Sequence, residues 1–261
     1  MLKEGDIVRI VEVAQRQPKS WIVTLVRDGE LSTHLGKIFH NECIGRRYGD
    51  QLKKEKKVFI LLKPSVRDFL RHFRLKTQIL YADDCAIACN LAGLSSGMRV
   101  GEAGTGSGAL TLFLAHNVHP TGQVFSFDIN ADYIANAQKN LAITGLSDCI
   151  TFKLQDIRAP LEVRELDAFF LDFSSPYEAI DNIAPSLKSS GHLICFVPNW
   201  GQVEETVAQI RKSPYFFHVD TFEITRRNFT VNPERHIMRP VFRDLVYSGI
   251  LIHAIRINPN Q

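Results

Sequence analysis

The sequence predicts an α/β fold in which a mostly parallel sheet carries helices on both faces. The main observation is a regular alternation of strand-like and helix-like segments between residues 98 and 213. Such alternation is typical of β-α-β units, whose strands lie parallel. Residues 1–58 instead resemble a small β domain, and two further strand patterns follow the alternation.

The first part of the chain is rich in β-branched and aromatic residues, which suit short strands. Strands are expected in EGDIVRIVEV and SWIVTLV, and Asp28-Gly29 is a hairpin signal between VTLVR and ELST. A basic run from Lys53 to Lys57 is interpreted as a solvated turn, with a nucleic-acid contact as the alternative. We place the domain boundary beside it, at residue 58.

Residues 59–261 form the second domain, with 59–82 as a helical lead-in. A helix is expected in ADDCAIACNLAGL. Strands are then expected in MRVGEAG, GQVFSFDI, CITFKLQD, LDAFFLDF and GHLICFVPN, and helices in GALTLFLAHNV, NADYIANAQKNLAITG, SPYEAIDNIAPSLKSSG and QVEETVAQIRKS. FFHVDTFEIT and SGILIHAIRI are joined by a polar loop without a clear helix, so they are expected to pair antiparallel.

Composition narrows the function classes. With 261 residues, 45% apolar and 23% charged, the chain is expected to be a folded soluble protein. The net charge of +3 is too small to indicate a nucleic-acid partner by itself. Five cysteines without a CxxC pair argue against a disulfide framework and a zinc site. No apolar run approaches the roughly 20 residues of a membrane span. We expect a cytoplasmic protein without a metal or a membrane anchor.

A glycine-rich turn marks the candidate ligand site. Four glycines fall within eight residues, at Gly101, Gly104, Gly106 and Gly108. The turn lies between the first strand and first helix of the alternating region, where ligands of open parallel sheets bind. It also fits a loose GxGxxA spelling, so a nicotinamide or flavin site is an alternative. A tight turn that only lets the helix approach the sheet is another.

The acid Glu102, just ahead of the turn, decides between these ligands. It would repel a pyrophosphate, whereas a ligand that carries an ammonium and a sulfonium tolerates it. S-adenosylmethionine is such a ligand. Its carboxylate is expected on the free N–H groups at the start of the helix.

Three further acids end successive strands. Asp128 is placed to accept both ribose hydroxyls, although NAD enzymes use the same position. Asp156 is expected either to accept the adenine amine or to cap a helix. Asp172 closes a strand of nearly pure hydrophobic residues, where an unpaired acid is costly to bury. This favours a position facing the ligand over a helix cap.

Taken together, the motifs resemble the tRNA adenine-58 N1-methyltransferases over nearly the whole chain. EAGTGSGALTLFLA resembles the cofactor motif of that family, and PNWGQVEETV its PN-x-x-Q-V segment. TQILYADDCA resembles the preceding motif, with Ala82-Asp83 where Pro-Lys is usual. LDFSSPYEAI keeps the acid but has Ser174 for the first proline. MRPVFRDLVYSGIL has Tyr247-Ser248 in place of His-Thr, so the departures lie on the substrate side.

The resemblance implies a class I methyltransferase (Rossmann-like) fold with an antiparallel last strand and a homotetramer. It implies methyl transfer from S-adenosylmethionine to N1 of adenine-58 in the T-loop of tRNA, with adenine-57 a second candidate. Asp172 is then the acidic residue of the catalytic site, and Tyr81 lies beside the target base. The implied cofactor-binding residues are Gln78, Glu102, Gly104, Thr105, Gly106, Ser107, Gly108, Ala109, Asp128, Asp156 and Asp172.

Adenine N1 carries an in-plane lone pair, so the enzyme mainly has to position the base, which must leave its stack. Asp172 is expected to accept a hydrogen bond from the N6 amine and to stabilise the developing positive charge. Tyr81 is expected to stack on the base or bond to it, or else to pack under a loop. Two basic clusters are expected to bind RNA phosphate, or else to be solvated: Arg67, Arg71, Arg74 and Lys76, and Arg226, Arg227, Arg235, Arg239 and Arg243.

Three other functions are weighed. A protein isoaspartyl methyltransferase shares the glycine turn but fits LDFSSP and the first domain poorly. A nicotinamide oxidoreductase is disfavoured by Glu102 and by the antiparallel ending. A non-catalytic subunit of a modification complex is expected to lose the glycines and acids that this chain keeps.

Overall fold

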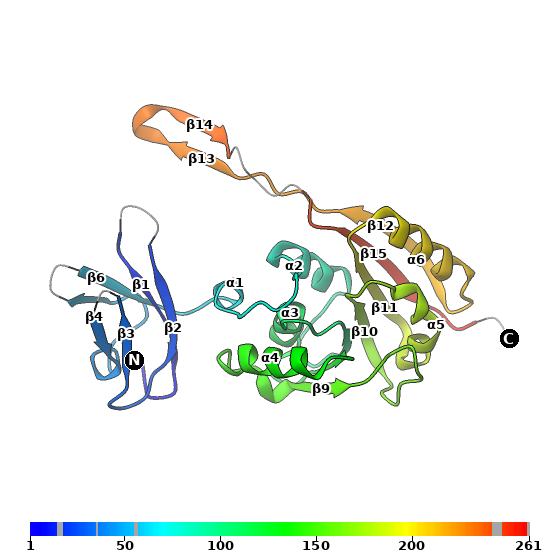
Figure 1. Ribbon diagram of the computed structural model, residues 1–261, viewed down its shortest axis with the longest axis horizontal. Helices are drawn as coiled ribbons and strands as arrows, with labels where there is room; N and C mark the ends of the chain where they lie inside the picture. The colour runs from blue at the N-terminus through cyan, green and yellow to red at the C-terminus, as the bar shows by residue number, and fades with distance from the viewer. Residues whose placement is uncertain (15–17, 35, 55–56, 242–246, 260–261) are drawn as a thin grey trace.

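The computed structural model describes residues 1–14, 18–34, 36–54, 57–241 and 247–259. Its larger domain is built on a seven-stranded sheet of order β12-β15-β11-β10-β7-β8-β9 (Figure 1). β15 is antiparallel to both its neighbours, and the other adjacent pairs are parallel. The predicted fold class is thus confirmed. The strands are β7 (Arg99–Ala103), β8 (Gln123–Asp128), β9 (Ile150–Leu154), β10 (Leu166–Leu171), β11 (Leu187–Val197), β12 (Phe216–Glu223) and β15 (Ile250–Arg256).

Helices cover both faces of this sheet because successive strand residues point to opposite sides. Val100, Phe170 and Ile194 pack in one core with α1 (Val66–Leu70), α2 (Ala82–Leu91), α3 (Ala109–Val118) and α4 (Ala131–Ala142). Phe169 and Leu193 pack in a second core with α5 (Ile180–Ile183) and α6 (Trp200–Lys212). None of the helices in the described ranges is both long and apolar enough for a membrane crossing.

One helix prediction in this domain is wrong, and one loop contains strands that were not predicted. The antiparallel pairing expected for FFHVDTFEIT and SGILIHAIRI is confirmed by β12 and β15. The helix expected over SPYEAIDNIAPSLKSSG is only a series of short turns, η3 (Pro176–Glu178), α5 and η4 (Ala184–Ser186), before β11 begins at Leu187. Pro185 has no N–H to continue a helix there. The polar loop between β12 and β15 contains a hairpin, β13 (Phe229–Asn232) and β14 (Ile237–Pro240), around η5 (Pro233–Arg235). Figure 1 shows this hairpin projecting from the body of the protein.

The amino-terminal region is an antiparallel sheet of order β2-β1-β6-β5 with an added hairpin, β3 (Glu30–Thr33) and β4 (Gly36–Phe39), followed by η1 (His40–Glu42). Its strands are β1 (Ile7–Glu12), β2 (Ser20–Thr24), β5 (Gln51–Lys54) and β6 (Lys57–Leu62). The boundary drawn at residue 58 falls inside β6, which still pairs with β1 at Leu62. The hairpin expected at Asp28-Gly29 is wrong, because β2 pairs with β1 and β3 with β4.

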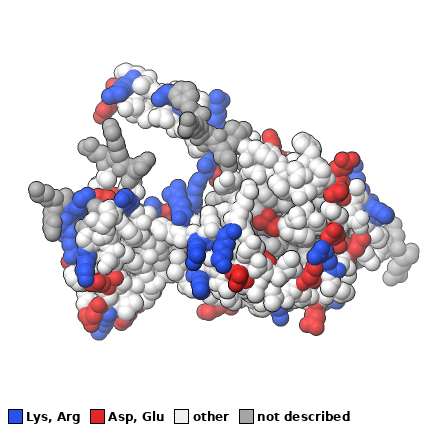
Figure 2. Space-filling model, viewed as in Figure 1, with Lys and Arg blue, Asp and Glu red and all other residues white. Residues whose placement is uncertain are grey.

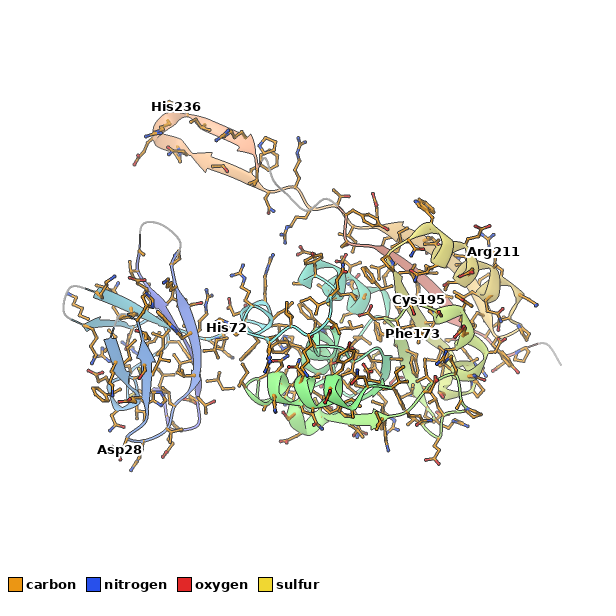
Figure 3. The ribbon with its side chains drawn as sticks, viewed as in Figure 1. Asp28, His72, Phe173, Cys195, Arg211 and His236 are labelled. Carbon is orange, nitrogen blue, oxygen red and sulfur yellow. The ribbon has the colours of Figure 1, made fainter. Side chains whose placement is uncertain are left out.

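Helix α1 joins the two domains. Arg9 of β1 forms a largely buried ion pair with Asp68 of α1, at 2.7 Å. The two ring nitrogens of His72 lie 2.8 Å from the Asp68 carbonyl oxygen and 3.1 Å from that of Ser20 (Figure 3). The amino-terminal sheet is therefore fixed beside the chain segment that leads to the candidate site.

A buried amide on α4 fixes this segment over the glycine turn. The Asn140 Nδ2 donates to the carbonyl oxygens of Arg74 at 3.1 Å and Ser107 at 2.9 Å. Its Oδ1 accepts from the Arg74 N–H at 2.9 Å. The segment after Arg74, which contains Thr77 and Gln78, thus lies against the turn that precedes α3.

Candidate active site

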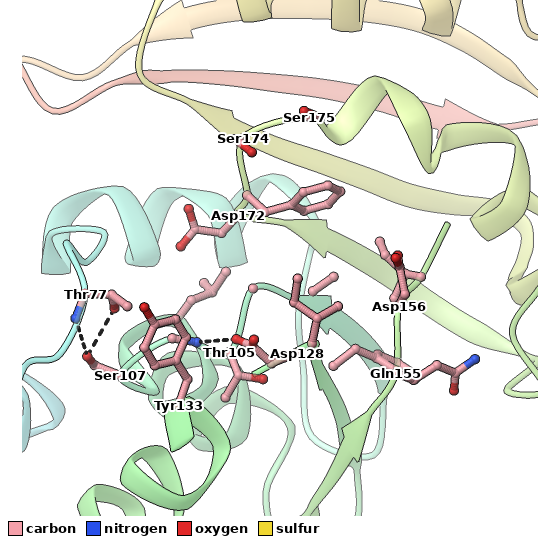
Figure 4. A pocket seen from close by; sticks show the side chains of 18 of the residues that line it. Thr77, Thr105, Ser107, Asp128, Tyr133, Gln155, Asp156, Asp172, Ser174 and Ser175 are labelled. Atoms are coloured by element: carbon pink, nitrogen blue, oxygen red, sulfur yellow. Dashed lines mark hydrogen bonds between the residues drawn. The ribbon is translucent and has the colours of Figure 1, made fainter. Parts of the chain in front are cut away.

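A cavity of about 460 Å³ opens at the carboxyl ends of the parallel strands β7, β8, β9 and β10. This is the edge at which open α/β sheets bind ligands, and the volume suits a small molecule. All the predicted cofactor-binding residues except Glu102 and Gly108 line it. Figure 4 shows Asp128, Asp156 and Asp172 around this cavity, each at the end of a different strand.

The glycine turn is required by close contacts as well as by backbone conformation. Gly104 has a φ of 95°, and a Cβ there would lie 2.0 Å from the carbonyl oxygen of Asp172. Gly106, with a φ of 52°, would place a Cβ 2.9 Å from Thr77 Oγ1. A side chain at either position would have to displace the end of β10 or the segment before α2. Gly108 does not face the cavity but packs against Ala137 of α4.

Hydrogen bonds fix the turn on both sides. The Asp128 carboxylate accepts from the backbone N–H groups of Gly106 at 3.0 Å and Asn130 at 2.9 Å. The Ser107 hydroxyl oxygen accepts from the backbone N–H of Lys76 at 2.9 Å. Asp128 therefore holds a fixed orientation at the end of β8, and each of its oxygens retains a further lone pair for a ligand.

Glu102 does not stand at the mouth of the turn, as the sequence analysis assumed. Its side chain is fully buried and does not line the cavity. Oε2 accepts from the hydroxyls of Thr111 and Ser126, both at 2.7 Å, whereas Oε1 has no hydrogen-bond partner. Burial raises the pKa of Glu102 to about 7, although the two hydroxyls lower it. Any electrostatic effect of Glu102 on a ligand therefore acts through the residues that line the cavity.

Asp172 does line the cavity, as predicted. Its backbone N–H donates to the Ala103 carbonyl at 2.9 Å, which brings the end of β10 beside the glycine turn. Burial, with the Glu102 carboxylate as the second cause, raises the pKa of Asp172 to about 8. Two nearby carboxyls with raised pKa values favour a ligand that brings positive charge, because it stabilises their ionised forms.

Asp156 lies at the cavity edge but is already paired. Both of its carboxylate oxygens accept from Arg158 Nε at 3.0 Å, and Arg158 Nη1 also reaches Glu178 at 3.1 Å. The Arg158 hydrogen bonds lower the pKa of Asp156. No helix follows Asp156 before β10, so the helix-cap alternative is wrong. The role of Asp156 as acceptor for the adenine amine stays a prediction. Its carboxylate would then be shared between the amine and Arg158.

Sequence reasoning missed several lining residues, among them Arg158 and Tyr133. Arg158 follows Asp156 by two residues, a spacing at which an acid binds nearby backbone, but its bridge to Glu178 depends on the tertiary fold. Tyr133 lies in the first turn of α4 and points toward the cavity in Figure 4. The sequence signal that could have identified Tyr133 is the helix expected immediately after Asp128.

Tyr81 is not in this cavity but lines a second one, of about 360 Å³. Ile79 lines both cavities, so the two adjoin. Three of the predicted basic residues, Arg67, Arg71 and Arg226, line the second cavity as well.

The other predicted basic residues are exposed along the chain. Arg74 and Lys76 lie in the segment before α2, while Arg227, Arg235 and Arg239 lie on the β13–β14 hairpin or at its base. Arg243 lies outside the described residues. Figure 2 shows Lys and Arg side chains gathered around α1, between the two domains. All five cysteines are buried and free, and the described residues hold no group of three side chains suited to a metal ion.

Comparison with known proteins shows the family of this chain. Residues 59–245 match the family described as the tRNA methyltransferase complex GCD14 subunit. The chain belongs to this tRNA methyltransferase family. It is 29% identical to the tRNA (adenine(58)-N(1))-methyltransferase TrmI of Thermus thermophilus, over 91% of this chain and 92% of that one. It is 28% identical to the Methanocaldococcus jannaschii TrmI, named for adenines 57 and 58, over 79% and 82%.

Solved structures agree with the assignment to a methyltransferase fold. The Aquifex aeolicus tRNA (m1A58) methyltransferase TrmI superposes with a TM-score of 0.77 at 27% identity, over 98% of this chain and 99% of that chain. A Thermotoga maritima protein described as a SAM-dependent O-methyltransferase superposes with a TM-score of 0.85 at 30% identity, over 100% and 96%. This methyltransferase therefore shares both of its domains with known relatives.

Gly104→Ala is expected to lower the free energy of unfolding by at least about 2 kcal/mol, because it combines a left-handed backbone with a clash against Asp172. Urea denaturation measures the loss. Gly93→Ala is the matched control, since Gly93 has a φ of 57° and open space around its Cβ position. Equal losses in the two variants would contradict the close-contact argument.

Asp172→Asn is expected to stabilise the protein increasingly, relative to wild type, as the pH rises from 5 to 8. In this range the unfolded chain, with carboxyl pKa values of about 4, has released protons that folded Glu102 and Asp172 still bind. The contribution of these groups to stability therefore falls with pH. Urea unfolding at several pH values measures it, with the exposed Asp132→Asn as control. A constant difference would refute the shared burial of the two carboxyls.

Proposed function

We propose that this methyltransferase transfers a methyl group from S-adenosylmethionine to N1 of adenine-58 in the T-loop of tRNA. The observation that carries the proposal is the adjacency of two cavities. One contains Asp172 and the glycine turn, and the other contains Tyr81 and three arginines. A methyl donor in the first and a base from an RNA in the second would meet near Ile79. The names of the Thermus and Aquifex relatives support the same target.

S-adenosylmethionine is proposed as the cofactor because the site fits its parts. The first N–H groups of α3 have no partner within the helix and suit its carboxylate. Asp128 is oriented for the ribose hydroxyls. The Glu102 and Asp172 carboxyls favour a cation, which this cofactor supplies as a sulfonium. A pyrophosphate ligand would be repelled by the same pair. When bound, the cofactor supplies the electrophilic methyl group.

The residues of the chain then perform positioning rather than proton removal. Asp172 accepts a hydrogen bond from the N6 amine of the target base, which fixes the ring and stabilises the positive charge that forms on it. A positively charged ligand beside Asp172 would favour its ionised form, which is the form that stabilises a positive charge on the base. Tyr81, which is 42% exposed at the start of α2, remains free to stack on the base.

We also propose that the protein is a homotetramer, as the resemblance implies. The β13–β14 hairpin supports self-association, because Val231 pairs with Met238 and Phe229 with Pro240 on one face. Val231 is 60% exposed and Met238 71%. A two-stranded hairpin with an uncovered apolar face is marginal alone. A second copy of the chain would cover this face.

Incubation with labelled S-adenosylmethionine and unmodified tRNA, followed by mass spectrometry of the nucleosides, tests the activity. We expect 1-methyladenosine at position 58.

Asp172→Ala is expected to abolish transfer while cofactor and tRNA binding largely survive. Asp128→Ala should instead weaken cofactor binding by about 1–3 kcal/mol in calorimetric titration. Turnover of the Asp172 variant, or methylation only of an oxygen acceptor, would contradict the proposal.

Val231→Lys is expected to lower the molar mass in light scattering, because it places a charge in the apolar face of the hairpin. Thr230→Lys is the matched control, since Thr230 lies on the opposite face of the same strand. A monomeric wild type, or equal masses for the two variants, would rule out the hairpin as the contact between copies.

A further inference from the structure

An acidic side chain lies between two arginines at the exposed side of the second cavity. Asp83 is in the first turn of α2, and its Oδ2 accepts a hydrogen bond from Arg226 Nη1. Its Oδ1 lies 4.0 Å from Nη1 of Arg67. Arg67 belongs to α1, and Arg226 to the segment between β12 and β13. All three side chains line the cavity, and each is 38–48% exposed.

We propose that this position between Arg67 and Arg226 is a binding site for a backbone phosphodiester of RNA, and that Asp83 occupies it until the RNA displaces the carboxylate. The proposal deepens the proposed function and rests on it, because it assumes an RNA substrate. It names the anion that the two arginines bind and the residue that competes with that anion.

Carboxylate and phosphodiester are interchangeable partners for arginine. Each presents two oxygens that share one negative charge, and a guanidinium donates N–H bonds to both. When the phosphate enters, both arginines keep an anionic partner. The displaced Asp83 remains in the first turn of α2, where the helix dipole stabilises its charge in water. Exposed ion pairs contribute little to stability, so the exchange requires little energy.

The location matches a nucleotide that enters the site. The second cavity is large enough for a nucleotide and adjoins the cofactor cavity through Ile79. Arg71 lines it as a third cation, and Tyr81 offers an aromatic ring. Figure 2 shows that Lys and Arg side chains continue around α1, which would extend the path of the RNA backbone. Asp84, the other acid of this cavity, is buried and accepts from the Ser248 hydroxyl at 2.9 Å, so it does not compete for the arginines.

The test measures tRNA affinity of the full-length protein against salt concentration. Asp83→Asn is expected to tighten tRNA binding roughly two- to fivefold, because no ion pair has to be broken. The slope of log K against log salt should become steeper by about one, since the wild type takes up a cation at the freed Asp83. Glu205→Gln, the same charge change on an exposed position of α6, is the matched control and should leave both quantities unchanged.

A second variant assigns the effect to the arginines. In an Arg226→Ala background, Asp83→Asn should gain less affinity than in wild type, because one of the two phosphate ligands is gone. Equal gains in both backgrounds would overturn the proposal. So would unchanged or weaker tRNA binding by Asp83→Asn, which would make the bridge a purely structural contact.

Inorganic phosphate distinguishes RNA from a free anion. At constant ionic strength it should compete weakly with tRNA for both proteins. If inorganic phosphate instead binds Asp83→Asn, in the absence of RNA, as tightly as tRNA does, the site is one for free phosphate and the RNA proposal fails. A wild type that neither binds nor methylates tRNA would refute the proposed function. Normal methylation by the wild type, together with unchanged tRNA binding by Asp83→Asn, would refute the displacement of Asp83 but not the proposed function.

Discussion

The close approach of Gly104 to the end of β10 is the contact on which the site depends. The backbone of Asp172 donates to the Ala103 carbonyl, and its own carbonyl oxygen occupies the space that a side chain at residue 104 would need. One strand end thereby delivers the acid of the site to the turn that precedes α3. The geometry follows from parallel pairing of β7 and β10, in which Leu171 and Ala103 are register partners. The acid proposed for catalysis and the turn proposed to bind the cofactor are thus linked by backbone contacts rather than by flexible side chains.

Much of this arrangement was predictable because the succession of strands and helices along the chain and the glycines of the turn are local signals. Asp128, Asp156 and Asp172 each follow an apolar strand pattern, so their meeting at one sheet edge follows from parallel topology. Glu102 was predicted at the mouth of the turn because the alternation of side chains along β7 was not considered. Val100 and Glu102 point toward α3, whereas Ala103 points to the other face and lines the cavity. The pair between Asp156 and Arg158 was missed because it depends on which way a long side chain folds.

The wrong or incomplete secondary-structure predictions have different physical origins. Asp28-Gly29 forms a turn, but a turn signal does not specify which strands pair across it. The β13–β14 hairpin was hidden within a polar segment because apolar and polar residues alternate in β13 but not in β14, and each strand has only four residues. The segment after Pro176 contains helix-forming residues, yet Pro185 and the pairing of Leu187 with Leu166 favour strand. Pairing with another strand thus overrides the local signal at β2 and at Leu187, whereas β13–β14 is a local hairpin whose sequence signal is weak.

The place of β15 within the sheet has a consequence for biosynthesis. This strand lies between β11 and β12, although both are made before it. Until Ile250–Arg256 leave the ribosome, the facing edges of β11 and β12 carry unpaired backbone groups beside apolar side chains. The nascent chain therefore exposes a gap into which a foreign strand can insert, so completion of the sheet has to await the synthesis of β15. Chaperone binding to the growing polypeptide would shield that gap.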